Sequence, residues 1–190
     1  MIRCQWALAS DIEAQYHDTE WGVPLHDDHK LFEFLLLEGA QAGLSWRTIL
    51  NKRDAYRLAF DDFDAEKIAA YDAAKVQQLL SNSGIVRNRL KIQAAILNAQ
   101  AFLSTQQTFA SFDAYIWQFI GGIPKQNVWQ KHSQIPAFSA ESEHMSHDLQ
   151  KRGFKFVGKT ICYAYMQAVG MVNDHTTDCF RYPQLSQMPS

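Results

Sequence analysis

The sequence has no long apolar run, and this absence restricts where the protein can work. No stretch of its 190 residues approaches the roughly 18 apolar residues that a membrane helix needs. The first residues, MIRCQWALASD, also lack the apolar core of a signal peptide. With 47% hydrophobic and 20% charged residues, the composition is that of an ordinary soluble protein. We therefore expect one globular cytosolic domain over residues 1–190, in which two helical lobes could flank a cleft.

Cysteine is scarce, which argues against a disulfide framework. The chain has three cysteines, Cys4, Cys162 and Cys179, and a reducing compartment leaves metal binding, catalysis or burial as their uses. Cys162 lies inside the apolar run TICYAYM and is expected in the core.

An excess of positive charge is missing as well. The net charge is −2 and the isoelectric point is near 6.4, so nothing in the overall charge favours nucleic acid. The charge is uneven, however, and clusters of this kind are either solvated faces or phosphate contacts. The basic clusters without an acid are Arg87, Arg89 and Lys91, and Lys151, Arg152, Lys155 and Lys159.

No segment alternates with the period of a half-buried strand, and no repeat or linker is present. Helix signals dominate, so the sequence predicts an all-α fold with about eight helices. Asp27 or Asp28, Ser45, Asp64 and Asp72 are the expected N-caps, and Gly84 is an expected helix end. The other expected helices cover residues 87–103, 111–120, 139–153 and 159–170.

The longest irregular stretch covers residues 121–139. A loop of this length in a compact domain is usually functional or mobile. Its two prolines and Trp129 indicate that it packs against the rest of the molecule.

The two ends of the chain carry residues that together make a zinc ligand set. If His175 and Cys179 share one helical turn, they provide half of a tetrahedral site, and Cys4 and His17 provide the other half. Four protein ligands leave no position for water, which is the pattern of a structural site. The spacing alone slightly favours the alternative, with an exposed terminal thiol, a core cysteine and surface histidines.

Glu38 ends the apolar run LFEFLLL. A carboxylate there is paired, protonated or positioned for a ligand, or it simply reaches solvent at the helix end. Four aromatic residues flank it in sequence, and a carboxylate among aromatic rings suits a flat cationic or amine-bearing ligand. Each ring taken singly favours a place in the core. The four are Trp6, Tyr16, Trp21 and Trp46.

Long blocks of the sequence resemble a known family. They are CQWA, YHDTEWGVP, LLLEGAQAGLSW, SGIVRNRLKIQAAILNA, KRGFKFVGKTICYAYMQAVGMVNDH and HTTDC. In this order they closely resemble the DNA-3-methyladenine glycosylase I family, bacterial base-excision repair enzymes of the helix-hairpin-helix superfamily. The resemblance runs from Cys4 to about Tyr182 and is highly specific.

The resemblance implies a cofactor, an activity and a base-binding site. Cys4, His17, His175 and Cys179 correspond to ligands of one structural Zn²⁺, which joins the N- and C-terminal segments. The implied activity is hydrolytic excision of 3-methyladenine that has been flipped out of double-stranded DNA. Tyr16 and Trp46 correspond to the stacking faces, Glu38 to the acceptor for the exocyclic amine, and Trp6 and Trp21 to the cavity wall.

It also implies the DNA contacts. The stretch GFKFVGKT resembles the hairpin of the superfamily, whose backbone N–H groups bind phosphate. The segment QAGLS resembles the wedge that fills the gap left by the flipped nucleotide, with Leu44 as the plug and Gln41 as a contact to the opposite strand. The expected hairpin contacts are Gly153, Lys155, Gly158 and Lys159.

The sequence departs from the wider superfamily at VNDH. Asn173 stands where many members have the aspartate that activates water, and Asp174 is one step out of register. Two alternative functions stay open. The first is a bifunctional glycosylase and lyase that uses Lys159, and the second is a non-catalytic protein that binds alkylated DNA. In each case the implied partner is alkylated double-stranded DNA, and an enzyme would also bind free 3-methyladenine as its product. We expect a monomer that is associated with the nucleoid.

Overall fold

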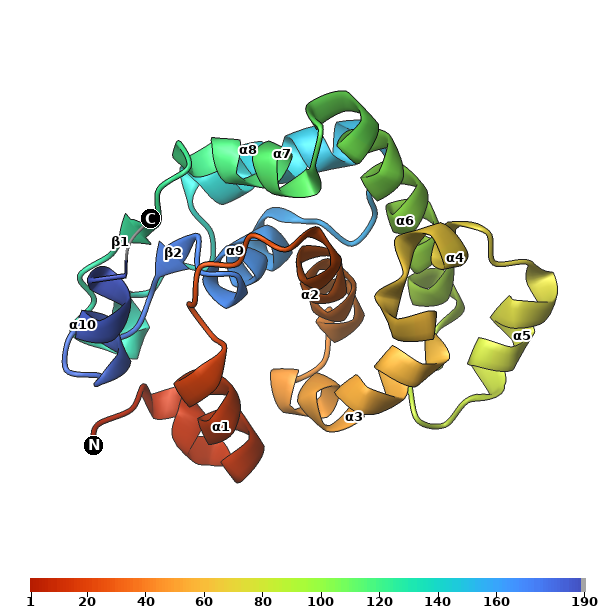
Figure 1. Cartoon of the computed structure of the whole chain (residues 1–190). Helices are drawn as coiled ribbons and strands as arrows, with labels where there is room; N and C mark the ends of the chain where they lie inside the picture. The colour runs from red at the N-terminus through yellow and green to blue at the C-terminus, as the bar shows by residue number, and fades with distance from the viewer. Residues whose placement is uncertain (189–190) are drawn as a thin grey trace.

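The structure is a computed structural model that describes residues 1–188, and it is mostly helical (Figure 1). This confirms the predicted helical fold. The α-helices of the described residues are α1 (Asp11–Thr19), α2 (Asp28–Gln41), α3 (Trp46–Ala59), α4 (Ala65–Ala69), α5 (Ala73–Ser81), α6 (Arg89–Phe109), α7 (Phe112–Trp117), α8 (Ala140–Lys151), α9 (Lys159–Ala168) and α10 (Arg181–Ser186). Short 3-10 helices are η1 (Gln5–Ala9), η2 (Asp61–Phe63), η3 (Gln118–Ile120) and η4 (His132–Gln134).

Helix α2 lies at the centre of the fold, between α3, α6, α7 and α9 (Figure 1). Every residue from Leu31 to Ala40 is buried, which explains why the helix is apolar on nearly all faces. The Asp27 side chain caps its N-terminus by accepting from the Lys30 N–H. Asp28 reaches across to α7, where its carboxylate accepts from the backbone of Phe112 and Asp113. The most apolar helix therefore organises the core.

Three further predicted N-caps are confirmed, because each side chain reaches the first turn of its own helix. Ser45, Asp64 and Asp72 each accept a hydrogen bond from the backbone N–H three residues later. The predicted end of α5 at Gly84 is wrong, because the helix ends at Ser81. Gly84 instead lies in the following turn, where a Cβ would approach the Ala55 Cβ to 2.9 Å.

The prediction missed helix α1, which carries two of the expected functional residues. Ser10 caps the helix, and its hydroxyl also donates to the Glu13 carboxylate at 2.7 Å. This Ser-x-x-Glu spacing is the signature of a capping box. The signal was present in the sequence, but it is short and stands next to no apolar run.

The 121–139 segment is irregular, as expected, and packs against the C-terminal part of the chain. It contains β1 (Lys125–Gln126), which pairs in parallel with β2 (Val172–Asn173). The Trp129 indole donates to Asp174 at 2.7 Å, which confirms that this segment is packed. The two strands were not predicted, because two residues are too few to show a period.

The segment before α1 and helix α10 lie on the same side of the molecule (Figure 1). The Phe180 N–H donates to the Ile2 carbonyl at 3.0 Å, so the segments before α1 and before α10 are in direct contact. Among the described residues, no helix has the length and apolar character to cross a membrane.

Candidate active site and metal centre

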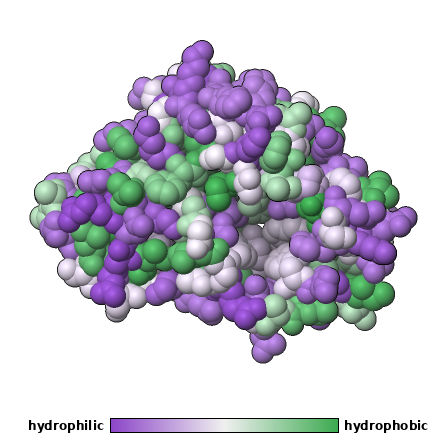
Figure 2. Space-filling view, turned by 180° about the vertical axis from the view of Figure 1, so that it is seen from behind, coloured by the Kyte–Doolittle hydropathy of each residue, from purple (hydrophilic) through white to green (hydrophobic). Residues whose placement is uncertain are grey.

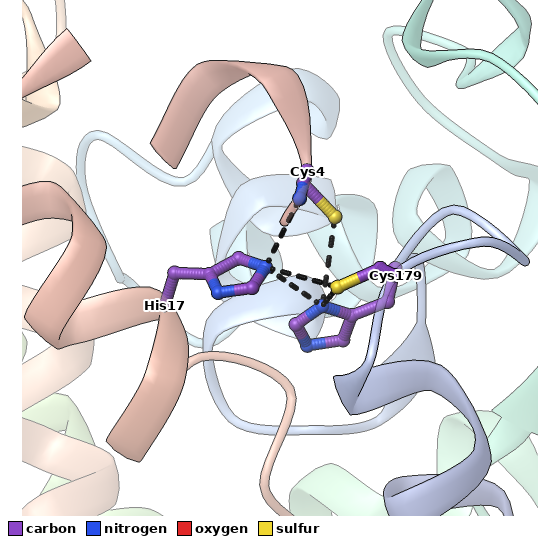
Figure 3. Close-up of side chains that lie close together, drawn as sticks. Cys4, His17 and Cys179 are labelled. Atoms are coloured by element: carbon purple, nitrogen blue, oxygen red, sulfur yellow. Dashed lines mark hydrogen bonds between the residues drawn. The ribbon is translucent and has the colours of Figure 1, made fainter. Parts of the chain in front are cut away.

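Two cysteines and two histidines from opposite ends of the chain form one buried cluster. Cys4 precedes η1, His17 lies on α1, and His175 and Cys179 follow β2. Figure 3 shows the side chains of Cys4, His17 and Cys179 directed toward one another. Their ligand atoms all lie within 4.8 Å of one another, and each residue is at most 2% exposed. The alternative of a solvent-exposed thiol and surface histidines is therefore wrong. The assumed helical turn is also wrong, since residues 174–180 form bends and turns.

The cluster has a donor set and a compactness that could hold a metal ion such as zinc. The His17 Nε2 and His175 Nδ1 atoms are 3.1 Å apart, and Cys179 Sγ lies 3.4 Å and 3.5 Å from them. Zinc with thiolate and imidazole ligands requires edges of roughly 3.3 to 3.8 Å. The outer ring nitrogens are held by Asp18 at 2.8 Å and by the Trp21 carbonyl at 3.1 Å. Such outer partners orient imidazole ligands in metal sites, so the donor set fits the ion.

A cavity of about 450 Å³ lies next to this cluster, and a hollow bordered by pale residues of intermediate hydropathy is visible in Figure 2. Its walls come from η1, α1, α2, α3, η4 and α9. The cavity brings together all of the residues expected to bind a base. They are Trp6, Tyr16, Trp21, Glu38 and Trp46, with Gln41 at the end of α2.

The aromatic residues of the cavity leave polar atoms without partners. The Tyr16 and Trp46 rings lie 5.4 Å apart between centroids, and Trp6 packs edge-on against Trp21 at 5.1 Å. Among the described residues, the Tyr16 hydroxyl and the Trp46 Nε1 are buried with no hydrogen-bond partner. A buried unpaired polar group costs free energy. This cost is expected where a ligand completes the bonding.

Glu38 is the acid of the cavity. It is 4% exposed, so the alternative that it reaches solvent is wrong. Burial raises the pKa of its carboxyl group to about 8, because a charge is poorly solvated among apolar neighbours. The same burial, with Glu38 nearby, raises the pKa of Tyr16 well above its usual value. A positively charged ligand would favour ionisation of Glu38.

Several cavity residues were missed by sequence reasoning. His132 and Ile135 come from the irregular segment, and Ala164 and Gln167 come from one face of α9. Their positions depend on contacts between distant segments, and no sequence signal could have found them. Glu13, also in the wall, could have been found as the capping-box acid. Its carboxylate binds Arg47 at 2.8 Å.

The expected hairpin residues lie apart from the cavity, between α8 and α9. Gly153 ends the α8 turn with φ +97°, a conformation that favours glycine. The Asn98 side chain holds the loop through the backbone N–H and carbonyl of Lys155, at 2.7 and 3.1 Å. Gly158 caps α9 without a side chain. Lys159 begins that helix and pairs with Glu143 at 2.8 Å.

The segment expected to act as a wedge follows α2 at the cavity. Leu44 is 39% exposed although it is apolar, and Gln41 Nε2 donates to its carbonyl at 2.7 Å. Lys91 of α6 donates to the carbonyls of Ala40 and Ala42 at 2.7 and 2.6 Å. The end of α2 is therefore fixed by an ammonium group, which a helix C-terminus favours.

Asn173 and Asp174 lie under the cavity wall and do not line it. The Asn173 amide donates to Gln126 Oε1 at 2.8 Å. Asp174 is 1% exposed, and its carboxylate accepts hydrogen bonds from four side chains. Neither side chain is free to activate a water molecule in the cavity.

The fold and the site define a helical protein with a buried acid in an aromatic cavity beside a potential metal centre. The family model described as methyladenine glycosylase matches residues 6–182, and the chain belongs to this family. It is 48% identical over 183 residues to DNA-3-methyladenine glycosylase 1 of Escherichia coli K12, covering 96% of this chain and 98% of that protein.

Solved structures agree with this assignment. A crystal structure of 3-methyladenine DNA glycosylase I superimposes with a TM-score of 0.94 at 49% identity and covers 96% of this chain and 100% of the other. A variant of 3-methyladenine DNA glycosylase I in complex with 3-methyladenine has a TM-score of 0.93 at 35% identity, with 96% and 98% covered.

Proposed function

We propose that the protein is a monofunctional DNA glycosylase that removes 3-methyladenine from alkylated DNA. The observation that carries the proposal is Glu38, a buried acid inside an aromatic cavity of about 450 Å³. Membership of the family supports the same reading. The bound 3-methyladenine in a structural relative indicates the ligand for which such a cavity is suited.

The chemistry follows from the charge of the lesion. Alkylation at N3 makes adenine a cation, so the base can leave as a neutral molecule. Water adds to C1′ of the sugar, the C1′–N9 bond breaks with its electron pair going to the base, and the water loses a proton. The enzyme mainly has to extrude and hold the base. An activated leaving group makes a dedicated water-activating aspartate unnecessary.

Tyr16, Trp46 and Glu38 divide the work of recognition. The Tyr16 and Trp46 rings stack on the flipped base, and their unpaired hydroxyl and indole N–H bond to it or to the sugar. The Glu38 carboxylate accepts from the exocyclic amine and interacts favourably with the positive charge. Burial raises the pKa of Glu38 to about 8, so a nearby positive charge favours its ionised form. The methylated base carries this charge and neutral adenine does not. Trp6 and Trp21 complete the wall.

The Cys4, His17, His175 and Cys179 cluster holds one structural Zn²⁺ in this proposal. Four protein ligands leave no open position for water or substrate, so the ion supplies folding free energy. The outer partners, Asp18 and the Trp21 carbonyl, support the role. Trp21 thereby connects the metal centre to the cavity wall.

The loop between α8 and α9 binds the DNA backbone in this proposal. Gly158 leaves the first N–H groups of α9 without a side-chain cap, and such groups bind phosphate. Exposed Lys151 and Lys155 add positive charge. Leu44 enters the duplex in place of the flipped nucleotide, and Gln41 contacts the opposite strand.

The test is release of base from methylated duplex DNA. We expect free 3-methyladenine from the wild type and at least a hundredfold slower release by Glu38→Gln, because its amide cannot carry the negative charge. Tight binding to methylated DNA without release would identify a non-catalytic damage binder instead. Borohydride trapping on abasic DNA tests the lyase alternative. No adduct is expected, since the Lys159 ammonium is paired with Glu143 and Lys159 does not line the cavity.

A further inference from the structure

Asp174 is a buried carboxylate whose hydrogen-bonding capacity is filled. It is 1% exposed, and each of its oxygens accepts two hydrogen bonds, all of 2.7 Å. A carboxylate has about four acceptor positions. The four donors are the side chains of Asn127, Trp129, Tyr163 and Gln167.

The two oxygens bind two different segments. Oδ1 accepts from Asn127 and Trp129, which lie in the irregular segment after β1. Oδ2 accepts from Tyr163 and Gln167, which lie on α9. One carboxylate therefore joins the 127–135 segment to α9.

Both of these segments line the cavity. His132 and Ile135 come from the first, and Ala164 and Gln167 come from the second. The backbone adds a further tie, because the Thr177 N–H donates to the Trp129 carbonyl at 2.8 Å. Residues 127 and 129 therefore tie the start of the 127–135 segment to Asp174, to α9 and to Thr177.

We propose that Asp174 is a positioning residue that sets the width of the base cavity by holding the 127–135 segment against α9. The inference rests on the proposed function, since it assigns this width to recognition of a methylated purine. Loss of one bond to the carboxylate would loosen the wall. Binding of a small base would then weaken, and discrimination against a larger base would fall.

Two tyrosines provide a matched test. Tyr163 donates to Asp174 at 2.7 Å, and Tyr115 donates to Asp148 at 2.8 Å. Both rings are almost fully buried, but Tyr115 and Asp148 do not line the cavity. Tyr163→Phe and Tyr115→Phe therefore delete the same kind of bond, and comparable losses of melting temperature are expected.

The two variants should differ in base binding. In calorimetric titrations of the purified protein, we expect Tyr163→Phe to weaken binding of free 3-methyladenine about tenfold, and Tyr115→Phe to change it less than twofold. Binding of 3-ethyladenine to Tyr163→Phe should weaken less than threefold, so the preference for the smaller base falls. A purely structural role would not change this preference.

Trp129→Phe provides the second test, because it removes a donor from the other segment. We expect Trp129→Phe to show the same loss of 3-methyladenine affinity and the same reduced preference for the smaller base as Tyr163→Phe. If Tyr163→Phe does not fold, Trp129→Phe alone tests the inference. Affinities and preferences like those of Tyr115→Phe in both variants would overturn the inference. The proposed function fails separately, when the wild type releases no 3-methyladenine from methylated DNA.

Discussion

Glu38 makes the stability of the protein depend on pH. Its pKa is raised by burial from 4.5 to about 8, so between these values the folded protein keeps a proton that the unfolded chain has lost. The free energy of unfolding therefore falls as pH rises through this window. Glu38→Gln cannot titrate, and we expect it to gain about 3 kcal/mol relative to the wild type between pH 5 and pH 8. Denaturant unfolding of both proteins across this range measures the difference.

Glu33 provides the control on the same helix. It is also buried, but Arg53 and Arg57 bind its carboxylate at 2.7 and 3.1 Å. Glu33→Gln should lose stability at pH 8, because two arginines then lack a charged partner. A stability difference between Glu38→Gln and the wild type that stays constant with pH would contradict the prediction.

Single residues could be predicted where local chemistry decides. Asp27, Ser45, Asp64 and Asp72 cap helices because their side chains reach a backbone N–H three residues later. For Glu38 the sequence left two alternatives, a buried carboxylate and one that reaches solvent. Sequence could not decide between them, because the exposure of a helix end depends on what packs over it. His132 and Gln167 gave no signal, because folding alone brings them to the cavity.

At the scale of elements, Arg53 connects α1, α2 and α3, three of the helices that line the cavity. From α3 its guanidinium binds Glu20 at the end of α1 and Glu33 on α2, both at 2.7 Å. These helices carry Tyr16, Glu38 and Trp46. The Arg53 network therefore fixes the helices relative to one another behind the cavity.

Arg53→Met should destabilise the fold by about 3 kcal/mol, because the buried Glu33 carboxylate then keeps only its ion pair with the more exposed Arg57. Arg57→Met is the matched control, since Arg57 is 41% exposed and its bonds are partly screened, and it should cost less than about 1 kcal/mol. Thermal and denaturant unfolding compare the two. Equal losses would show that Arg53 is no more than a surface ion pair.

Elements with many residues and a clear period could be predicted, and short ones could not. Helices α6 and α9 repeat apolar residues over several turns. Strands β1 and β2 have two residues each and pair across 47 positions of sequence. Their pairing is a result of tertiary packing. The helical turn assumed for His175 and Cys179 was wrong because contacts with the N-terminal segment bring the two side chains together on an irregular chain.

At the scale of the whole molecule, the Cys4, His17, His175 and Cys179 cluster joins the two ends of the chain. Cys179→Ser should bind no zinc and should lower the melting temperature by about 10 °C or more, since metal binding contributes to folding. Metal analysis of the purified protein should give one zinc per wild-type chain. Chelation of the wild type should lower its melting temperature to a similar extent.

Cys162→Ser is the control for a buried cysteine outside the cluster. Its thiol donates to the Val157 carbonyl at 3.3 Å, a bond that a serine hydroxyl can replace. This variant should keep its zinc and lose much less stability than Cys179→Ser. Equal melting temperatures for the two variants, or loss of zinc from Cys162→Ser, would contradict the structural role of the cluster.

The distance in sequence between His17 and His175, 158 positions, has a consequence during synthesis. At about 5–20 residues per second, the ribosome exposes Cys4 and His17 roughly ten to thirty seconds before their partners emerge. In that interval the Cys4 thiol and the His17 imidazole lack the two side chains that contact them in the folded protein. The cluster cannot close before His175 and Cys179 emerge, so a nascent chain that stops before residue 175 cannot assemble it.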